Sequence, residues 1–515
     1  MELESDKYDV IVLGTGLAES IAAAALAKAG KSVLHLDGNE YYGGDEASLT
    51  LDELATWAQA RAGAPSTSSA ARSDSSDYLR AQRIRFTNAT TTALTPALQA
   101  NRRRYAISLQ PALMPSRGAL VTTLISSDVS KYVSFRLLDG VSIWEDGAAR
   151  RVPGGKEDVF QDKSVSLLDK RRLMKALMFI GGEFEDEEQL KGHEQDGILD
   201  FLTAAFALPP RLAAAVTYAI AHASSPADPA LASLVRARRY LRSMGRYGPS
   251  AFLVGQYGGA GEVAQGYCRA CAVFGGTYVL GPEAMPEAIG VEDGGVTVKI
   301  PGHPRPLSAG HVVTSDDFLP PSLVPVASYG TRTTARGIAV VTSQPGVLKR
   351  APPPDADEDE AVPEDDDTGV VVFPPVDGAP LARALIMGEG TGSCPAGQWI
   401  VYLWTEAGVG DDAKAKLQPF LERLVPGGAV FESYYLEHTV ESATAAAVTT
   451  STSCSPPGLV RLERYTGGQT LTEALDFAAD AGRAAFDAVL GPGEHEGQGF
   501  FEKAGGDEEE AGDDE

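Results

Sequence analysis

Cysteine is scarce in this sequence, with four residues in a chain of 515. So few cysteines in so long a chain do not form a disulfide scaffold. The N-terminus lacks the basic stretch followed by an apolar stretch that marks a secretion signal. No run of 18 or more apolar residues is present, so we expect no membrane-spanning helix. These absences together predict a reduced, cytoplasmic protein.

Basic residues are outnumbered, 44 against 70 acidic residues, and the formal net charge is −26. We therefore expect no nucleic-acid partner, because phosphate backbones are bound by clustered lysine and arginine. Two segments, residues 351–368 and residues 504–515, carry 9 and 7 acids and no base. Without them the charge is about −10, which is ordinary for a chain of this length. We interpret residues 351–368 as a solvated linker and the C-terminal end as a disordered acidic tail.

Side chains that hold metals or perform catalysis are also few. The seven histidines are not clustered at metal-ligand spacing. Cys268 and Cys271 have the spacing of a redox or metal pair, but neither a second such pair nor a CxxH sequence lies nearby. No Ser-His-Asp set and no P-loop can be identified. We predict no metal site and no catalytic residue.

The N-terminal region predicts a Rossmann-type unit over residues 8–44. Residues 8–13 are a β-branched apolar run, residues 20–29 are a strong helix former, and residues 32–37 are a second apolar run. Between the first strand and the helix lies a turn with Gly14 and Gly16, and Asp37 follows Gly16 by 21 positions. Strand, glycine turn, helix and acid in this order are typical of dinucleotide binding.

One position departs from this dinucleotide pattern. Glu19 stands where the third glycine of GxGxxG is expected, the glycine that lets helix and strand pack closely. Its carboxylate adds bulk and puts a negative charge near the place of a pyrophosphate, and the helix N-terminus favours only one anion there. We infer a fold that has lost its dinucleotide and needs no cofactor. The alternative is that Glu19 points away and FAD still binds.

The remaining sequence predicts an α/β chain of two domains. Apolar residues recur at helical spacing from about Ser164 to Ala223, whereas strand patterns occupy residues 132–152, 250–300, 369–405 and 428–442. We assign residues 1–152 and 241–492 to a large domain, with an Ala/Ser-rich surface insertion at 60–77 and the acidic linker at 351–368. We assign residues 153–240 to a helical domain and residues 493–515 to the disordered tail.

Three blocks of sequence resemble the Rab GDP-dissociation inhibitor and Rab escort protein superfamily. The first comprises YDVIVLGTGLAE at 8–19, VLHLD at 33–37 and YYGG at 41–44. The second lies between Arg246 and Tyr278 and includes GE at 261–262, QG at 265–266 and FGGTY at 274–278. The third is LDKRRLMK at 168–175. The resemblance implies a flavin-monooxygenase-like (FAD/NAD(P)-binding, Rossmann-type) large domain, a small all-helical domain, and binding of Rab proteins and prenyl groups without catalysis.

Further stretches resemble the escort branch of that superfamily, among them LAESI at 17–21, CRACAVF at 268–274 and CPAGQ at 394–398. Such a protein is implied to bind Rab GTPases in the GDP state, the Rab geranylgeranyltransferase heterodimer and a geranylgeranyl lipid. It is implied to be cytoplasmic and to contact membranes transiently. Two alternatives remain: an inhibitor that recycles prenylated Rabs, and an FAD-dependent oxidoreductase.

The resemblance also implies roles for individual residues. It assigns Rab binding to Tyr42, Glu262, Gln265, Arg269, Thr277 and Tyr278. Tyrosine supplies rigid contact area and arginine supplies directed, charge-assisted bonds, as a protein-binding platform requires. The ordinary alternative is that the two tyrosines are core residues and that Glu262 and Arg269 form an internal ion pair. In the helical block, Leu173, Leu177, Met178 and Phe179 are candidates for prenyl or transferase binding, or for the core.

Overall fold

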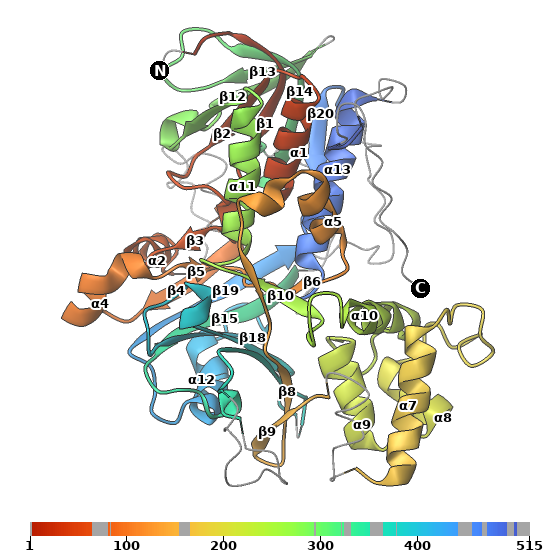
Figure 1. The fold of residues 1–515 in the computed structure, drawn as a ribbon. Coiled ribbons are helices and arrows are strands. Elements are labelled where there is room, and N and C mark those ends of the chain that lie inside the picture. The colour runs from red at the N-terminus through yellow and green to blue at the C-terminus, as the bar shows by residue number, and fades with distance from the viewer. Residues whose placement is uncertain are drawn as a thin grey trace.

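The computed structural model describes residues 3–63, 81–82, 84–153, 165–292, 295–320, 322–323, 331–350, 364–376, 378–440, 456–465, 471–491 and 499–501. Two large β-sheets lie one above the other in Figure 1, and a group of helices lies beside the second sheet. None of the described helices combines the length and the apolar character needed to cross a bilayer.

Within the described residues the first sheet has seven strands, in the order β11-β2-β1-β14-β13-β12, with β20 paired to β14. They are β1 (Lys7–Leu13), β2 (Val33–Asp37), β11 (Thr277–Leu280), β12 (Ala288–Glu292), β13 (Gly295–Lys299), β14 (Leu307–Ser315) and β20 (Leu459–Leu462). Strands β11, β2, β1, β14 and β20 run parallel, whereas β12 and β13 pair antiparallel. The continuous apolar run from Val10 to Leu13 is fully buried, as expected of a central parallel strand.

Three helices pack together against the first sheet: α1 (Leu17–Lys28), α11 (Ala260–Val273) and α13 (Ala474–Leu490). The alanine-rich helix α1 is buried along most of its length. Gly482 lets α13 approach α1 closely, because a Cβ at Gly482 would lie 2.8 Å from Ile21 Cγ2. β1, α1 and β2 confirm the predicted strand–turn–helix–strand unit.

The second sheet has eight strands within the described residues, in the order β4-β19-β15-β18-β17-β16-β8-β9. They are β4 (Phe86–Thr91), β8 (Val141–Glu145), β9 (Ala148–Arg151), β15 (Thr331–Val341), β16 (Thr368–Phe373), β17 (Ala382–Gly388), β18 (Trp399–Ala407) and β19 (Phe431–Val440). Helix α12 (Ala413–Leu424) packs on this sheet through Leu417, Phe420 and Leu421.

Short elements connect the two sheets. Helix α2 (Leu51–Gln59) begins with a capping box, in which the Thr50 hydroxyl accepts from Glu53 N and the Glu53 carboxylate accepts from Thr50 N. The remaining strands are β3 (Ser48–Leu49), β5 (Ile107–Ser108), β6 (Met114–Pro115), β7 (Phe135–Leu137) and β10 (Phe252–Gly255). The remaining helices here are α4 (Pro96–Asn101), α5 (Ala119–Ser126), and the 3₁₀ turns η1 (Gly44–Glu46), η3 (Arg102–Arg104), η4 (Val129–Lys131), η6 (Pro282–Ala284), η7 (Asp316–Phe318), η8 (Gly346–Leu348) and η9 (Glu389–Thr391).

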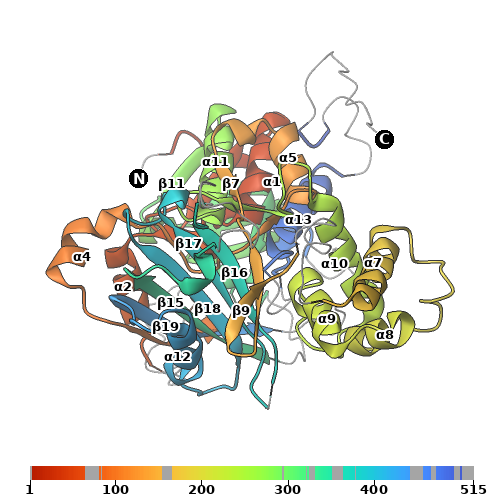
Figure 2. The same ribbon diagram turned by 60° about the horizontal axis from the view of Figure 1, so that its bottom comes forward.

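The helical region lies to one side of the second sheet and is separate from α12 in Figure 2. It comprises α7 (Leu167–Gly181), α8 (Ile198–Phe206), α9 (Pro210–Ala215), the π-helical turn η5 (Val216–Ile220) and α10 (Ala230–Ser243). Phe179, Phe184, Phe201 and Phe206 form an aromatic cluster among these helices. The core of this region is continuous with the core under the second sheet.

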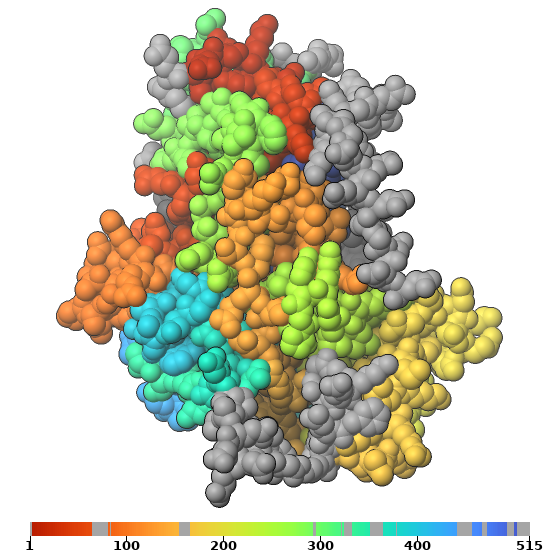
Figure 3. All heavy atoms as spheres, viewed as in Figure 1, coloured from red at the N-terminus to blue at the C-terminus, as the bar shows by residue number. Residues whose placement is uncertain are grey.

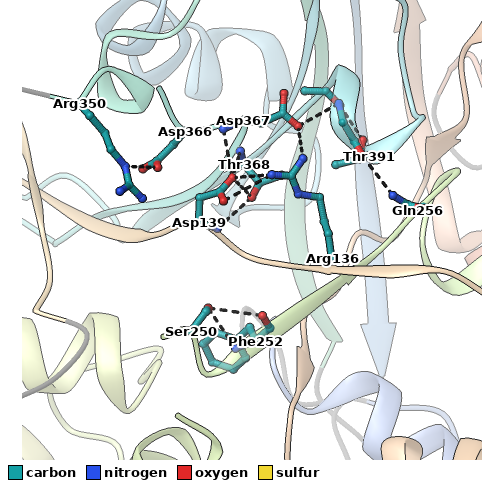
Figure 4. Close-up of polar contacts among 12 residues, drawn as sticks. Arg136, Asp139, Ser250, Phe252, Gln256, Arg350, Asp366, Asp367, Thr368 and Thr391 are labelled. Carbon is teal, nitrogen blue, oxygen red and sulfur yellow. Dashed lines mark hydrogen bonds and ion pairs between the residues drawn. The ribbon is translucent and has the colours of Figure 1, made fainter. Parts of the chain in front are cut away.

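The prediction that residues 351–368 are a solvated linker was wrong at the end of this segment. Asp366 is buried and Thr368 begins β16, which pairs with β17 and β8. Figure 4 shows Arg136 and Asp139 holding this segment: Arg136 Nη1 donates to Asp367 Oδ2 over 2.9 Å, and Asp139 Oδ2 accepts from the amides of Asp367 and Thr368 over 3.1 and 2.9 Å. The last acids are therefore ordered because they meet arginine and amide donors. Residues 351–363 lie outside the described residues.

Two other predicted segments lie largely outside the described residues: the insertion 60–77 from residue 64 onward, and most of the tail 493–515. Within the tail, however, Phe501 is 3% exposed and contacts Tyr267 with a ring distance of 5.9 Å. Lys28 Nζ donates to the Phe501 carbonyl over 3.0 Å. The prediction of disorder was wrong at this point, because Phe500 and Phe501 supply apolar surface that packs against the helices.

Candidate functional site

The loop between β1 and α1 has the backbone form of a dinucleotide-binding turn. Gly14 has φ +95°, a conformation that L side chains rarely adopt. A Cβ at Gly14 would lie 2.6 Å from the Phe318 ring, so this ring packs against the loop and leaves no room for a side chain at position 14. Gly16 then precedes the first residue of α1. The backbone alone would therefore permit the close approach that a pyrophosphate requires.

Asp37, the acid at the end of β2, is already saturated by donors of the protein. Its Oδ2 accepts from Thr15 N over 2.7 Å and from Thr15 Oγ1 over 2.6 Å. Its Oδ1 accepts from Asn39 N and Asn39 Nδ2 over 2.8 and 2.9 Å. Burial raises the pKa of Asp37, while these hydrogen bonds act in the opposite direction. Asp37 therefore holds the loop to the strand instead of presenting its carboxylate to a ribose.

Two carboxylates lie at the N-terminus of α1. Glu19 is 8% exposed, and burial followed by repulsion from Glu46 raises its pKa to about 8. Burial, followed by repulsion from Asp45, raises the pKa of Glu46 to about 7. The place that an anion would take at this helix end is thus lined by acids. The residues present do not fit a dinucleotide.

The cavity beside this loop has a volume of about 130 Å³. Pockets that hold a cofactor or drug-sized ligand are larger, roughly 300–1,000 Å³. An ionic network lines it: Arg85 pairs with Asp45 and, over 3.1 Å, with Glu437, while Arg464 reaches Asp317 over 2.6 Å. Burial raises the pKa of Asp317 to about 7. Side chains from distant parts of the sequence thus come together around this cavity.

The cysteine pair on α11 consists of buried, free thiols. Burial raises the pKa of Cys268 to about 12 and that of Cys271 to about 11, so both remain protonated at neutral pH. The Sγ of Cys268 lies 3.3 Å from Ser20 Oγ on α1. Among the described residues no group of three His, Cys, Asp or Glu side chains is arranged to hold a metal ion.

Three of the six residues assigned to Rab binding by resemblance lie on one face of α11. Glu262, Gln265 and Arg269 are spaced at i, i+3 and i+7, and Gln265 Nε2 donates to Glu262 Oε1 over 3.2 Å. Burial raises the pKa of Glu262. Arg269 is exposed, and its guanidinium lies 4.6 Å from the centroid of the Tyr132 ring. Within the described residues Arg269 makes no ion pair, so the alternative of an internal pair with Glu262 is wrong.

The other three residues lie on or beside β11. Tyr278 and Tyr42 meet edge to face, with ring centroids 5.8 Å apart, and Tyr278 also contacts His35 over 4.8 Å. Burial raises the pKa of both tyrosines, and the Cys268 thiol on α11 adds to the increase at Tyr42. Tyr42, Thr277 and Tyr278 are each partly exposed. The structure therefore brings these residues beside α11, and their role in binding remains a prediction.

The four helical candidates do not share one groove. Leu173 and Leu177 line a cavity of about 60 Å³ between α7, α9 and the β8–β9 hairpin. Phe179 belongs to the aromatic cluster, with its ring 5.1 Å from that of Phe206. Met178 is 68% exposed and points away from this packing. A helical periodicity indicates which residues share a face, but it does not distinguish a cavity wall from a packed core.

Sequence reasoning missed two residues of this site, Glu46 and Tyr132. Glu46 follows the YYGG motif by two positions, and its acidic type close after that motif was the one available signal. Tyr132 precedes β7 and meets Arg269 only through the fold, so no local pattern identifies it.

The chain is similar to a protein-family model and to several known proteins. The model described as "GDP dissociation inhibitor" matches residues 3–81 and 82–343. "Rab proteins geranylgeranyltransferase component A" of Drosophila melanogaster is 30% identical over 84% of this chain and 80% of its own length. "Guanosine nucleotide diphosphate dissociation inhibitor 2" of Arabidopsis thaliana is 27% identical over 84% of this chain and 86% of its own length.

Two solved structures have a similar fold. A Rab GDI from Plasmodium falciparum superposes with a TM-score of 0.65 and 18% identity, over 94% of this chain and 98% of its own. An oxidoreductase from Methanosarcina mazei superposes with a TM-score of 0.55 and 12% identity, over 92% and 99%. These likenesses confirm the predicted α/β fold class, a flavoenzyme-like architecture with an added helical part.

Proposed function

The chain belongs to the GDP dissociation inhibitor family, and on that premise we propose that it is a Rab escort protein. In this role it binds Rab GTPases in the GDP state and presents them to the Rab geranylgeranyltransferase heterodimer. It then covers the attached geranylgeranyl groups and delivers the Rab to a membrane. The observation that carries the proposal is the similarity to a transferase component A, which extends over four fifths of that relative's length.

The face of α11 is well suited to hold a folded partner. Arg269 offers its N–H donors to the outside because no acid of the described chain occupies them. Tyr42 and Tyr278 add rigid rings beside the helix. Binding by such a surface leaves the partner's fold intact, as escort requires.

The helical region supplies a place for the lipid. A geranylgeranyl chain exposed to water is costly, at about 0.8 kcal/mol for each CH₂ that a protein could bury. Most residues that line the cavity beside Leu173 and Leu177 are apolar, and the charged residues Glu145, Arg150, Arg151 and Arg211 line it as well. At about 60 Å³ it is too small for a C20 chain, so lipid entry requires α7 to move relative to α9 or the hairpin.

The chain itself performs no bond chemistry in this proposal. Its loop at Gly14–Gly16 serves as scaffold because Glu19, Glu46 and Asp37 do not fit a dinucleotide. The transferase supplies the catalytic groups. The protein resides in the cytoplasm and contacts membranes only while it delivers its cargo.

The deciding experiment is a reconstituted prenylation reaction. Purified protein is mixed with a GDP-loaded Rab, the transferase heterodimer and geranylgeranyl diphosphate, and lipid attachment is measured by mass spectrometry. We expect attachment to depend on this protein and to follow its concentration until the Rab is saturated. An assay in which the transferase modifies the Rab equally well without it would overturn the proposal.

A second candidate is a GDP dissociation inhibitor that recycles prenylated Rabs, which the description of the matching family model and the Arabidopsis relative favour. An inhibitor extracts a prenylated Rab from liposomes but does not support prenylation of an unmodified Rab. Extraction without stimulation of the transferase would therefore select the inhibitor.

A further inference from the structure

Tyr132 and Arg269 form a contact that the function proposed above leaves unexplained. The guanidinium carbon of Arg269 lies 4.6 Å from the centroid of the Tyr132 ring. Both side chains are exposed, the tyrosine to 45%. The Arg269 side chain makes no hydrogen bond or ion pair with the described residues, so among them the Tyr132 ring is the group that orients it.

The turn that carries Tyr132 contacts α11 at three positions along the helix. Ser127 Oγ donates to Tyr267 OH over 3.3 Å. At Gly266 the turn comes so close that a Cβ would lie 2.9 Å from Val129 Cγ1 and 3.1 Å from Val133 Cγ1. Further along the helix, Tyr132 meets Arg269. Because Val129 is fully buried, the base of this turn is fixed.

The same surface is continuous in the folded molecule. In Figure 3 the surface of α11 lies beside that of α5 and the segment that follows it. Gln256, just before α11, donates its backbone amide to the Ser134 carbonyl over 2.9 Å, so the segment after Tyr132 is tied to the start of α11 as well. The backbone on both sides of Tyr132 is therefore tied to α11, which keeps its ring within reach of the Arg269 guanidinium.

We propose that Tyr132 is a positioning residue for Arg269. Its ring holds the guanidinium in an outward orientation by a cation–π contact, and this contact leaves the N–H donors in the guanidinium plane directed at acceptors on the bound protein. An arginine without such support samples many rotamers and loses this freedom on binding. The inference rests on the proposed function, since the partner is the GTPase that α11 binds.

The proposal predicts how the two residues depend on each other. Removing the ring should weaken binding about two- to fivefold, the usual range of an exposed cation–π contact. Tyr132→Phe retains the π face and should bind as the unsubstituted protein does. Tyr132→Leu retains apolar bulk without the π face and should bind as Tyr132→Ala does. In an Arg269→Ala background, Tyr132→Ala should have no further effect.

The test is a double-mutant cycle on the full chain, with affinity for a GDP-loaded Rab measured by calorimetry and folding checked by thermal unfolding. Single and double variants should share the melting temperature of the parent within a few degrees, because both side chains are exposed. Additive losses of affinity in the double variant would mean that Tyr132 contacts the partner directly. Equal affinity of the parent and all Tyr132 variants would mean that the ring does not contribute to binding. Either result overturns the inference. If the unsubstituted protein binds no Rab, the proposed function itself fails, and that outcome is seen before any variant is tested.

Discussion

The carboxylates of Glu19 and Glu46 converge beside Gly16 at the N-terminus of α1. A Cβ at Gly16 would lie 2.6 Å from Glu19 Oε2 and 3.2 Å from Glu46 Oε2, so both acids face the same small space. In a dinucleotide-binding protein this space belongs to phosphate oxygens. Here two neighbouring acids, both with raised pKa values, occupy it.

We expect the free energy of unfolding to fall as the pH rises through the neutral range. Burial raises the pKa of Glu19 from 4.5 to about 8, so between these values the folded state holds a proton that the unfolded state has released. The stability that this proton contributes is therefore fully present below about pH 4.5 and is lost progressively up to about pH 8. Glu19→Gln should remove the share of this pH dependence that Glu19 contributes, leave the shares of Glu46 and Asp317, and be more stable than the parent at pH 8. Each tenfold difference between the acid dissociation constants of the two states corresponds to about 1.4 kcal/mol.

Urea unfolding at intervals from pH 5 to pH 8 measures this slope. Glu283→Gln, which changes an exposed carboxylate in the same way, is the matched control and should leave the slope unchanged. Parallel curves for Glu19→Gln and the parent would contradict the raised pKa of Glu19.

We expect a large excess of FAD to leave the melting temperature unchanged. A bound dinucleotide would stabilise the folded state by mass action, but Asp37 is saturated by Thr15 and Asn39, and Glu19 and Glu46 occupy the place of the phosphate. Differential scanning fluorimetry with FAD provides the measurement, and an established flavoprotein serves as the positive control. A yellow purified protein with flavin absorbance would refute the loss of the cofactor.

Arg269→Ala should weaken binding of a GDP-loaded Rab by more than roughly tenfold, the scale of a hot-spot truncation. The melting temperature should change by only a few degrees, because Arg269 is exposed and its contact with Tyr132 is a surface contact. Arg103→Ala, an equal change of charge on the exposed turn η3, should bind normally. Unchanged affinity of the Arg269 variant would remove this residue from the platform.

Phe179→Ala should lower the free energy of unfolding by about 3 kcal/mol, because its ring stacks on Phe184 and packs against Phe206. Met178→Ala, on the neighbouring exposed position, should change it by no more than about 0.5 kcal/mol. Chemical denaturation of both variants measures the difference. Equal effects would mean that Phe179 is not part of the packed core and would restore it as a groove candidate.

Much of the fold could be predicted from local sequence. The apolar run to Leu13, the glycines at 14 and 16 and the alanine-rich stretch after Glu19 each favour one backbone form, and the structure has β1, the turn and α1 there. Patterns within one element predict well because their partners lie only a few residues away.

The strand pattern predicted over residues 250–300 was wrong at Ala260–Val273, where the structure has helix α11 and places Glu262, Gln265 and Arg269 on one of its faces. Gly261 and Gly266 lower the helix propensity of this stretch, but they let α11 pack closely on Ser48 and Val129.

The sequence by itself determined the Rossmann unit and the misfit of an acid at position 19. Only the tertiary structure decided that the Glu46 carboxylate lies beside that of Glu19, and that the Asp37 carboxylate accepts hydrogen bonds from Thr15. It also decided that the Tyr132 ring contacts the Arg269 guanidinium. It also decided that the end of the acidic run is ordered by Arg136 and Asp139. The physical reason is range: backbone preference acts between neighbours in the chain, whereas charge, burial and ring contacts depend on which distant residues the packed core brings together.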